Sequence, residues 1–295
     1  MIEVSPHPTE LFGMKASVSG LAVFLDNFAI MDLAENDPNR RRRFIATLSR
    51  GVDVLFSVSN AAELSGPQGN SFRTTREFLD EVGAHWFPVE FDPYECVTRE
   101  KRLQHLPFFC EGLLKTFTAE HLRRSPEIKL ADLPDSLPSD FFRLGLFMDW
   151  LAPQRDQIID DKRQMDLRLK DQIMAYRTEH EKNPGWLDAN LPEVPFAVDR
   201  PATYVYRNLL RLLVREGTIN RNDGFDFGQA VIGTAYASIA TLDKHWKRRV
   251  EKILPKPNKL ARLYYQPELD KMVRDIERSL DNASLARGRA LCSLH

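Results

Sequence analysis

Five short apolar runs punctuate the chain, each four to six residues long. They are Leu21–Leu25, Val52–Phe56, Trp86–Val89, Ser238–Leu242 and Leu260–Tyr265. Their apolarity is continuous rather than alternating, which is typical of strands buried on both faces of a parallel sheet. Segments with helical or turn character separate them, and strands that alternate with helices indicate an α/β fold. The pattern therefore predicts a doubly wound parallel sheet of about five strands flanked by helices.

Helices are expected between these runs, because apolar positions recur there at helical spacing. An Asp37-Pro38 pair divides the first helical stretch, since the residue before a proline avoids helical geometry. Pro201 begins another helix at a first-turn position, where a proline is well tolerated. The expected helical segments are 28–49, 59–65, 72–83, 201–216, 226–237, 244–253 and 267–281.

Between about residues 92 and 198 no strand pattern occurs, and the sequence indicates several helices separated by prolines. The longest, Gln154–Lys182, is highly charged and has a narrow apolar stripe. A structural buttress or a dimer surface is the simpler role for such a segment, and a substrate lid is the alternative. We therefore expect a core of residues 20–91 and 199–282, a large helical insertion at 92–198, and terminal extensions at 1–19 and 283–295.

Composition limits the class of protein. The 295 residues are 43% hydrophobic and 28% charged, so the chain can bury a core and has no signature of disorder. The formal net charge of −1 means that any basic, nucleic-acid-binding surface must be local. Three widely spaced cysteines without a CxxC pair argue against a disulfide framework or a structural zinc site. Without a signal-peptide pattern or an apolar run of ~20 residues, we expect a soluble, cytoplasmic protein with no membrane partner.

Acidic residues follow the ends of the predicted strands. Asp26 comes directly after the first strand, Glu63 lies one turn into the helix after the second, and Asp243 follows the fourth. Asp226, with Asp223 three residues before it, opens the helix that leads into the fourth strand. Doubly wound proteins bind ligands at the carboxyl edge of the sheet. The sequence thus brings Asp26, Glu63, Asp226 and Asp243 to one edge.

Each carboxylate also has a purely structural explanation. Helix capping or compensation of a helix dipole could account singly for Asp26, Asp223, Asp226 and Asp243, and Asn60 with Glu63 has capping-box spacing. Capping gives no reason, however, for all of them to reach the same edge. Several carboxylates at one place repel each other unless a cation lies between them, and oxygen ligands without histidine or cysteine select Mg²⁺ or Mn²⁺.

This order and spacing resemble those of the PIN-domain nucleases. The resemblance rests on Asp26 after an apolar strand, a second strand leading through small polar residues to Glu63, a helix-opening Asp226, and a strand ending T-L-D-K at Asp243. It covers roughly residues 20–90 and 200–265. It implies a PIN-like parallel sheet with helices on both faces. It also implies phosphodiester hydrolysis in RNA, less often in DNA, with one or two divalent ions.

The resemblance also implies roles for individual residues. Asp26 would be the central metal ligand, Glu63 and Asp226 would complete the site, and Asp243 would complete the shell of a second ion or of water. Asp223 could replace or assist Asp226. Candidates for supporting or substrate hydrogen bonds are Asn27, Ser57, Asn60, Thr241 and Lys244.

A basic run begins directly after Asp243, with the sequence KHWKRRVEK. Lys247, Arg248 and Arg249 form a local positive field that could attract phosphates, although a solvated helix face is the simpler explanation. Trp246 could stack on a base, but core packing is the favoured prediction for it. The basic run beside a carboxylate cluster makes nucleic acid the expected partner, RNA before DNA.

Together these features predict a divalent-metal-dependent endoribonuclease of toxin-like or defence type. Two alternatives stay open, namely a structure-specific DNA nuclease of the flap-cleaving type and a non-catalytic PIN-like module that binds nucleic acid or protein. An inhibitor protein and a homo-oligomer formed through the insertion are further partners to consider.

Overall fold

The structure is a computed structural model that describes residues 2–18, 20–66, 70–133, 135, 137, 138, 140–216 and 223–292. The side chains of residues 70–72 and 284–292 are not described. Of the expected terminal extensions, Met1, Ser19 and residues 293–295 lie outside the described residues.

Five parallel strands form the central sheet, and each coincides with one of the apolar runs. They are β3 (Leu21–Phe24), β4 (Val52–Ser57), β5 (Trp86–Val89), β6 (Ile239–Thr241) and β7 (Arg262–Tyr264), in the spatial order β5-β4-β3-β6-β7. In the register, Val23 of β3 pairs with Val54 on one side and Ile239 on the other. The expected α/β fold with a five-stranded parallel sheet is confirmed. Since β3 is central and the chain moves outward from it in both directions, the strand order reverses between β3 and β6.

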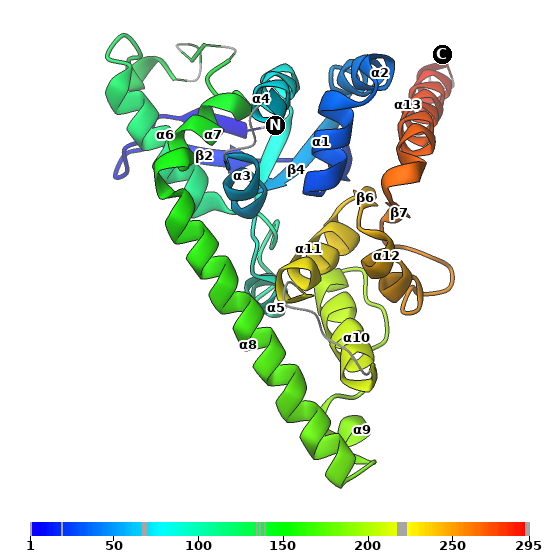
Figure 1. Ribbon diagram of the computed structural model, residues 1–295. Coiled ribbons are helices and arrows are strands. Elements are labelled where there is room, and N and C mark those ends of the chain that lie inside the picture. The colour runs from blue at the N-terminus through cyan, green and yellow to red at the C-terminus, as the bar shows by residue number, and fades with distance from the viewer. Residues whose placement is uncertain are drawn as a thin grey trace.

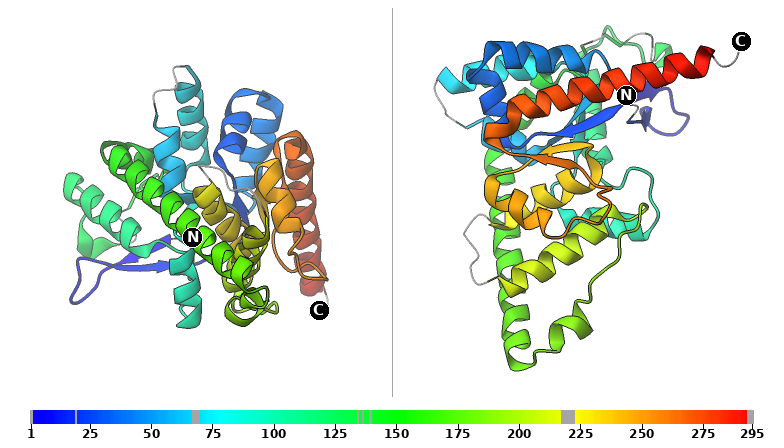
Figure 2. Two further views of the ribbon diagram at one scale, coloured as in Figure 1. Left: turned by 60° about the horizontal axis from the view of Figure 1, so that its bottom comes forward. Right: turned by 90° about the vertical axis from the view of Figure 1, so that its right-hand side faces the viewer.

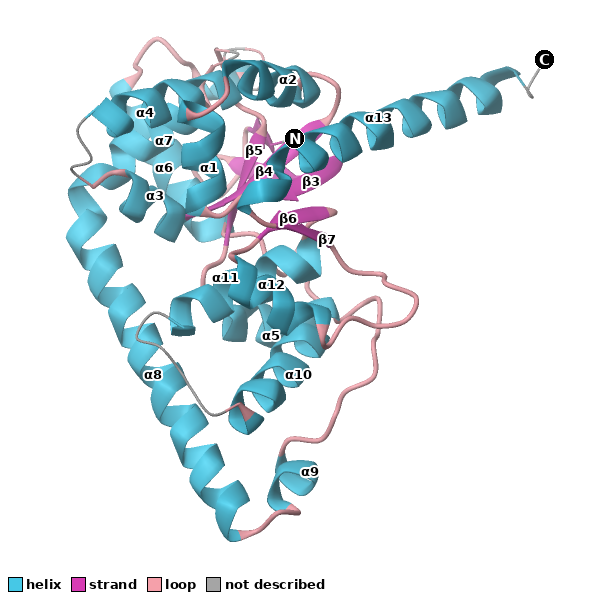
Figure 3. Cartoon of the chain, turned by 45° about the vertical axis from the view of Figure 1, so that its right-hand side comes forward, coloured by secondary structure: helices cyan, strands magenta, loops and turns pink. Residues whose placement is uncertain are grey.

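Helices cover both faces of this sheet, as Figure 3 shows. On one face lie α1 (Asn27–Glu35), α2 (Pro38–Leu48), α4 (Asn70–Val82) and α13 (Leu269–Cys292); on the other lie α10 (Pro201–Arg215), α11 (Asp223–Tyr236) and α12 (Lys244–Glu251). The break at Asp37-Pro38 is confirmed, because the Asp37 carboxylate caps α2 by accepting the Asn39 amide at 2.8 Å. Helix α3 (Val58–Leu64) follows β4 directly.

The segment 92–198 is predominantly helical, and its described residues add no strand to the central sheet. Its elements are α5 (Pro93–Lys101), α6 (Glu111–Arg124), η1 (Leu130–Asp132), α7 (Leu144–Leu151), η2 (Ala152–Gln154), α8 (Arg155–Lys182) and α9 (Trp186–Asn190). Helix α8 packs against α3, α11 and α10, and it is the long diagonal helix of Figure 1. It thus crosses the molecule beside the edge at which β4 ends and α3 begins.

Most of the buried hydrophobic side chains of this segment join the core of the sheet. Cys96, Leu114, Phe147 and Ile173 belong to the same buried hydrophobic cluster as the strands of the sheet. Trp86 of β5 packs its ring 4.6 Å, centroid to centroid, from the ring of Phe147. The two parts of the chain therefore share one hydrophobic core.

The N-terminal residues form a small hairpin that the apolar pattern does not predict. Strands β1 (Ile2–Ser5) and β2 (Gly13–Ala16) pair antiparallel, and Val4 and Phe12 pack in a second cluster with Leu122 and Phe141. The N-terminal extension expected at residues 1–19 therefore contains a β-hairpin. Four-residue strands with a single fully buried side chain in β1 give too little alternation to detect.

The C-terminal helix α13 continues beyond the predicted end of the core at residue 282 and projects from the body of the molecule, as the right-hand view of Figure 2 shows. It is preceded by a short helix, η3 (Gln266–Glu268). Within the described part of the chain, no helix combines the length and the apolarity that crossing a membrane requires.

Candidate active site

Asp26 lies at the centre of the carboxyl edge, where the strand order reverses. It ends β3 and caps α1, so its carboxylate Oδ1 accepts the Ala29 amide at 3.1 Å. The Thr241 hydroxyl at the end of β6 accepts the Asp26 amide at 2.8 Å and lies 3.1 Å from Asp26 Oδ1. These bonds join the two strands at the reversal point and leave Asp26 only 7% exposed.

Asp243 and Asp226 reach the same place from β6 and α11. Asp243 caps α12 by accepting the Trp246 amide at 2.7 Å and is exposed. Asp226 lies in the first turn of α11 and is half-buried. Both acids are therefore held by helix starts, whose positive dipole ends favour negative charge.

Glu63 on α3 belongs to a hydrogen-bonded network that starts in β4. Asn60 donates to Asn27 Oδ1 at 2.8 Å, and Asn27 donates to Glu63. The Ser57 hydroxyl donates to Asn60 Oδ1 at 2.6 Å and caps α3. The capping box is thus formed by Ser57 and Asn60, while the Glu63 carboxylate stays directed at the carboxyl edge.

One cavity of about 180 Å³ joins these side chains. Its lining includes Asp26, Asn27, Glu63, Asp226 and Asp243, together with Trp246 and Phe225. The four carboxylates that the sequence brings to one edge therefore do face a common space.

Burial and mutual repulsion disfavour negative charge in this cavity. Burial raises the pKa of Asp26 to about 8, and the nearby Asp243 and Asp226 carboxylates add to the rise. Burial also raises the pKa of Asp226 to about 7, again with repulsion from Asp243. A cation between these groups would relieve both effects.

The carboxylate oxygens are nevertheless not gathered around one point. Among the described residues, no group of three or more His, Cys, Asp or Glu side chains is placed to hold a metal ion. The reason is local, because Glu63 is bound by Lys162 and Asn27 while Asp26 and Asp243 accept backbone amides. The oxygen donors fit Mg²⁺ or Mn²⁺ in chemistry, but Glu63 would have to exchange its present partners for an ion.

Lys162 is a member of this site that the sequence analysis missed. It comes from α8, forms an ion pair with Glu63, and its ammonium lies 4.0 Å from the centroid of the Phe225 ring. Nearby on α8, the Asp166 carboxylate accepts the Phe225 amide at 2.5 Å and so caps the start of α11. Nothing distinguishes Lys162 in the sequence, because α8 carries many charged residues without a motif.

Asp223 does not line the cavity, which corrects its expected role beside Asp226. Its side chain is buried, and its carboxylate lies 3.5 Å from the Arg249 guanidinium. A Cβ atom at the next residue, Gly224, would lie 2.5 Å from the Asp166 backbone, so α8 and α11 approach each other closely here. This contact fixes the start of α11 with Asp226 toward the cavity and Asp223 away from it.

The basic run after Asp243 divides into buried and exposed members. Arg249 is 2% exposed and pairs with Glu216 at 2.8 Å, so the structure contradicts its expected role in binding phosphate. Lys247 is paired with Glu268, whereas Lys244 and Arg248 are exposed on α12. Trp246 is buried, which confirms core packing for that ring. Burial follows helical spacing, since Trp246, Arg249 and Val250 lie on the inward face.

Comparisons of the chain with protein-family models, with curated proteins and with solved structures found no match.

Proposed function

We propose that this protein is a divalent-metal-dependent nuclease that hydrolyses phosphodiester bonds, with RNA as the favoured substrate and a toxin-like or defence-type role. The observation that carries the proposal is the cavity at the strand-order reversal, which Asp26, Glu63, Asp226 and Asp243 line together. This is the position at which doubly wound sheets bind ligands. The preference for RNA rests on the resemblance to PIN-domain nucleases, and a flap-cleaving DNA nuclease is the enzymatic alternative.

In this proposal the acidic residues would bind the metal ion and the basic residues would bind the substrate. Asp26 and Asp226 would hold Mg²⁺ or Mn²⁺, with Glu63 and Asp243 joining them directly or through water. The Thr241 hydroxyl would orient the Asp26 carboxylate, because the two already lie 3.1 Å apart. A bound ion lowers the pKa of water and stabilises the charge that develops on the reacting phosphate. Lys162 and the exposed Lys244 and Arg248 would attract the phosphates of the strand.

The test is incubation of the purified protein with labelled single-stranded RNA and DNA in Mg²⁺, Mn²⁺ or chelator. We expect metal-dependent cleavage that Asp26→Asn abolishes, because Asn keeps the cap but lacks the anionic oxygen. Asp37→Asn is the matched control, since Asp37 also caps a helix but does not line the cavity. Full cleavage by Asp26→Asn, or wild-type cleavage that a chelator leaves unchanged, would rule out this mechanism.

A non-catalytic interaction module is the second candidate. The observation that favours it is the satisfaction of the carboxylates by protein donors, above all the ion pair between Lys162 and Glu63. For a nuclease, Lys162→Gln removes the cationic partner of Glu63, so Mn²⁺ should raise the melting temperature more in this variant than in the wild type. Lys170→Gln, on an exposed position of the same helix, should respond like the wild type. A melting temperature that Mn²⁺ changes in neither protein, together with no cleavage, would favour the module.

A further inference from the structure

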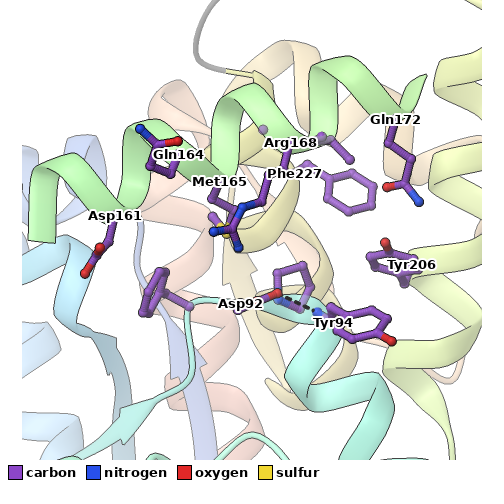
Figure 4. A pocket seen from close by; sticks show the side chains of 13 residues that line it. Asp92, Tyr94, Asp161, Gln164, Met165, Arg168, Gln172, Tyr206 and Phe227 are labelled. Carbon is purple, nitrogen blue, oxygen red and sulfur yellow. Dashed lines mark hydrogen bonds between the residues drawn. The ribbon is translucent and has the colours of Figure 1, made fainter. Parts of the chain in front are cut away.

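A second cavity lies near the acidic one and has no role in the proposed chemistry. Its volume is about 630 Å³, within the range of small-molecule sites. Its walls come from the start of α5, the middle of α8, α10 and the first turns of α11, and Figure 4 shows its lining side chains. We call it the α5–α8 pocket.

The α5–α8 pocket and the acidic cavity are both lined by the first turn of α11, and α8 lies near both. In α11, Gly224 and Phe227 line the pocket, while Phe225 and Asp226 between them line the acidic cavity. In α8, Met165 lines the pocket, and Lys162 one turn earlier reaches Glu63. Because successive residues of a helix are about 100° apart, the two cavities lie on opposite sides of this turn. A strand whose phosphate lies at the carboxylates would therefore reach the pocket by passing around the start of α11.

Aromatic rings dominate one end of the α5–α8 pocket. Figure 4 shows Tyr94, Tyr206 and Phe227 together there. Phe227 and Tyr206 meet edge to face, with centroids 5.3 Å apart. Tyr94 is 58% exposed, so its ring is free to stack on a group that enters from solvent. Such rings bind nucleobases of any sequence, because every base presents a π face.

Polar groups also line the α5–α8 pocket, with Gln172 beside these rings and Gln164 toward the other end (Figure 4). The amides of Gln164 and Gln172 line the pocket from α8, and the Asp92 carboxylate faces them from the start of α5. Arg168 extends from α8 into the pocket, where burial raises the pKa of the Asp92 carboxyl and the positive charge of Arg168 opposes that rise. Amides can pair with the edges of a base, and a guanidinium can bind a phosphate or stack on a ring.

We propose that the α5–α8 pocket binds an unpaired base of the single-stranded nucleic acid that reaches the acidic cavity. The proposal rests on the proposed function for the identity of the ligand. The base stacks on the tyrosine rings, and Arg168 binds the phosphate or the π face beside it. A paired base cannot enter, because it would first have to leave its duplex. The pocket thus selects single strands and fixes their position relative to the carboxylates.

The test measures binding apart from cleavage, by fluorescence anisotropy of a short labelled single-stranded RNA in EDTA. Tyr94→Ala should weaken binding at least about fivefold, the lower end for loss of one stacked base, and Arg168→Gln should weaken it similarly. Two exposed matched controls, Leu103→Ala after α5 and Arg163→Gln on α8, should stay within about twofold of the wild type. A duplex and a strand with abasic residues should bind weakly to all of these proteins.

Several results would overturn the inference. They are no binding of the single strand by the wild type, equal binding of duplex and single strand, unchanged affinity in Tyr94→Ala and Arg168→Gln, or an equal loss in Arg163→Gln. Tight binding of free mononucleotides without binding of the strand would also overturn it in favour of a nucleotide site. Metal-dependent cleavage with unaltered binding by the pocket variants would remove this inference and leave the proposed function. Binding of the strand that depends on the pocket, without cleavage in any metal, would remove the proposed nuclease function and leave this inference.

Discussion

Asp26 is the residue at which the electrostatics of the candidate site are most unfavourable. Its carboxylate is buried, and its pKa rises to about 8 from an ordinary value of 3.8. Between these pH values the folded protein binds the proton more tightly than the unfolded chain does. The contribution of this group to stability is therefore favourable in acid and is lost as the pH rises through that window.

Because Asp26 contributes less to stability as the pH rises, Asp26→Asn should be the more stable protein at high pH in the presence of a chelator. The variant should melt at a higher temperature than the wild type at pH 8, by roughly 5 °C or more, because Asn carries no charge to bury. At pH 5 the difference should be smaller, since only the lower part of the window between 3.8 and about 8 has been crossed. Thermal unfolding followed by circular dichroism at the two pH values measures it.

Asp37→Asn serves as the opposite control. Hydrogen bonds from the Arg40 and Asn39 amides lower the pKa of Asp37, so its charged form is favoured in the folded protein. Neutralising it should give no gain in melting temperature at pH 8. An equal gain in both variants would mean that general charge reduction, rather than burial of Asp26, raises the stability.

At the scale of elements, Glu100 joins the predicted insertion to the predicted core. This residue of α5 is 1% exposed and accepts the Ala202 amide at 2.8 Å and the Thr203 amide at 2.7 Å, at the start of α10. It also accepts the Tyr236 hydroxyl at 2.7 Å, at the end of α11. One carboxylate thus caps a helix and ties together three elements that are distant in the sequence.

Removing this carboxylate should leave several buried donors without an acceptor. We expect Glu100→Ala to lower the free energy of unfolding by at least about 2 kcal/mol, measured by urea denaturation. Glu95→Ala, at an exposed position of the same helix, should change it by less than about 0.5 kcal/mol. A small effect of Glu100→Ala would show that water replaces the carboxylate and that the α5–α10 junction is loosely packed.

At the scale of the whole molecule, the sheet and the helices of residues 92–198 share one hydrophobic core. The clustered side chains include Phe87 and Trp86 from β5 together with Phe109, Phe117 and Phe147 from the predicted insertion. Because these surfaces are buried in part against each other, we expect that neither part folds on its own. The segment is a layer of the fold rather than an appended domain.

Deletion of residues 92–198 tests whether the sheet depends on this shared core. We expect the full chain to unfold in urea in a single transition, and a chain in which a Gly-Ser linker replaces residues 92–198 to show no cooperative transition. Exposure of the aromatic side chains of β5 is the reason. A deletion variant that unfolds cooperatively, with a denaturant slope that matches its smaller size, would contradict this prediction and show that the core folds without residues 92–198.

Local sequence patterns determined the strands, the break at Asp37-Pro38 and the four acids that line the cavity. Continuous apolar runs specify buried parallel strands, and a residue directly after such a strand must lie at the carboxyl edge. The same reasoning failed for Asp223 and Arg249, because a helix turns each residue by a fixed angle and the packing of neighbours selects which face is buried. The hairpin of residues 2–16 escaped because its strands are too short to establish a period.

Only the tertiary structure decided what surrounds those acids. Lys162 and Glu63 are 99 positions apart, and no local pattern relates an α8 lysine to an α3 glutamate. The α5–α8 pocket likewise arises where four helices meet, so its lining is dispersed over the chain. The sequence by itself thus determined the sheet and the edge at which acids gather, because both depend on short-range periodicity. The partners of the acids and the adjoining pocket depend on the packing of α8, which is fixed by contacts between distant segments.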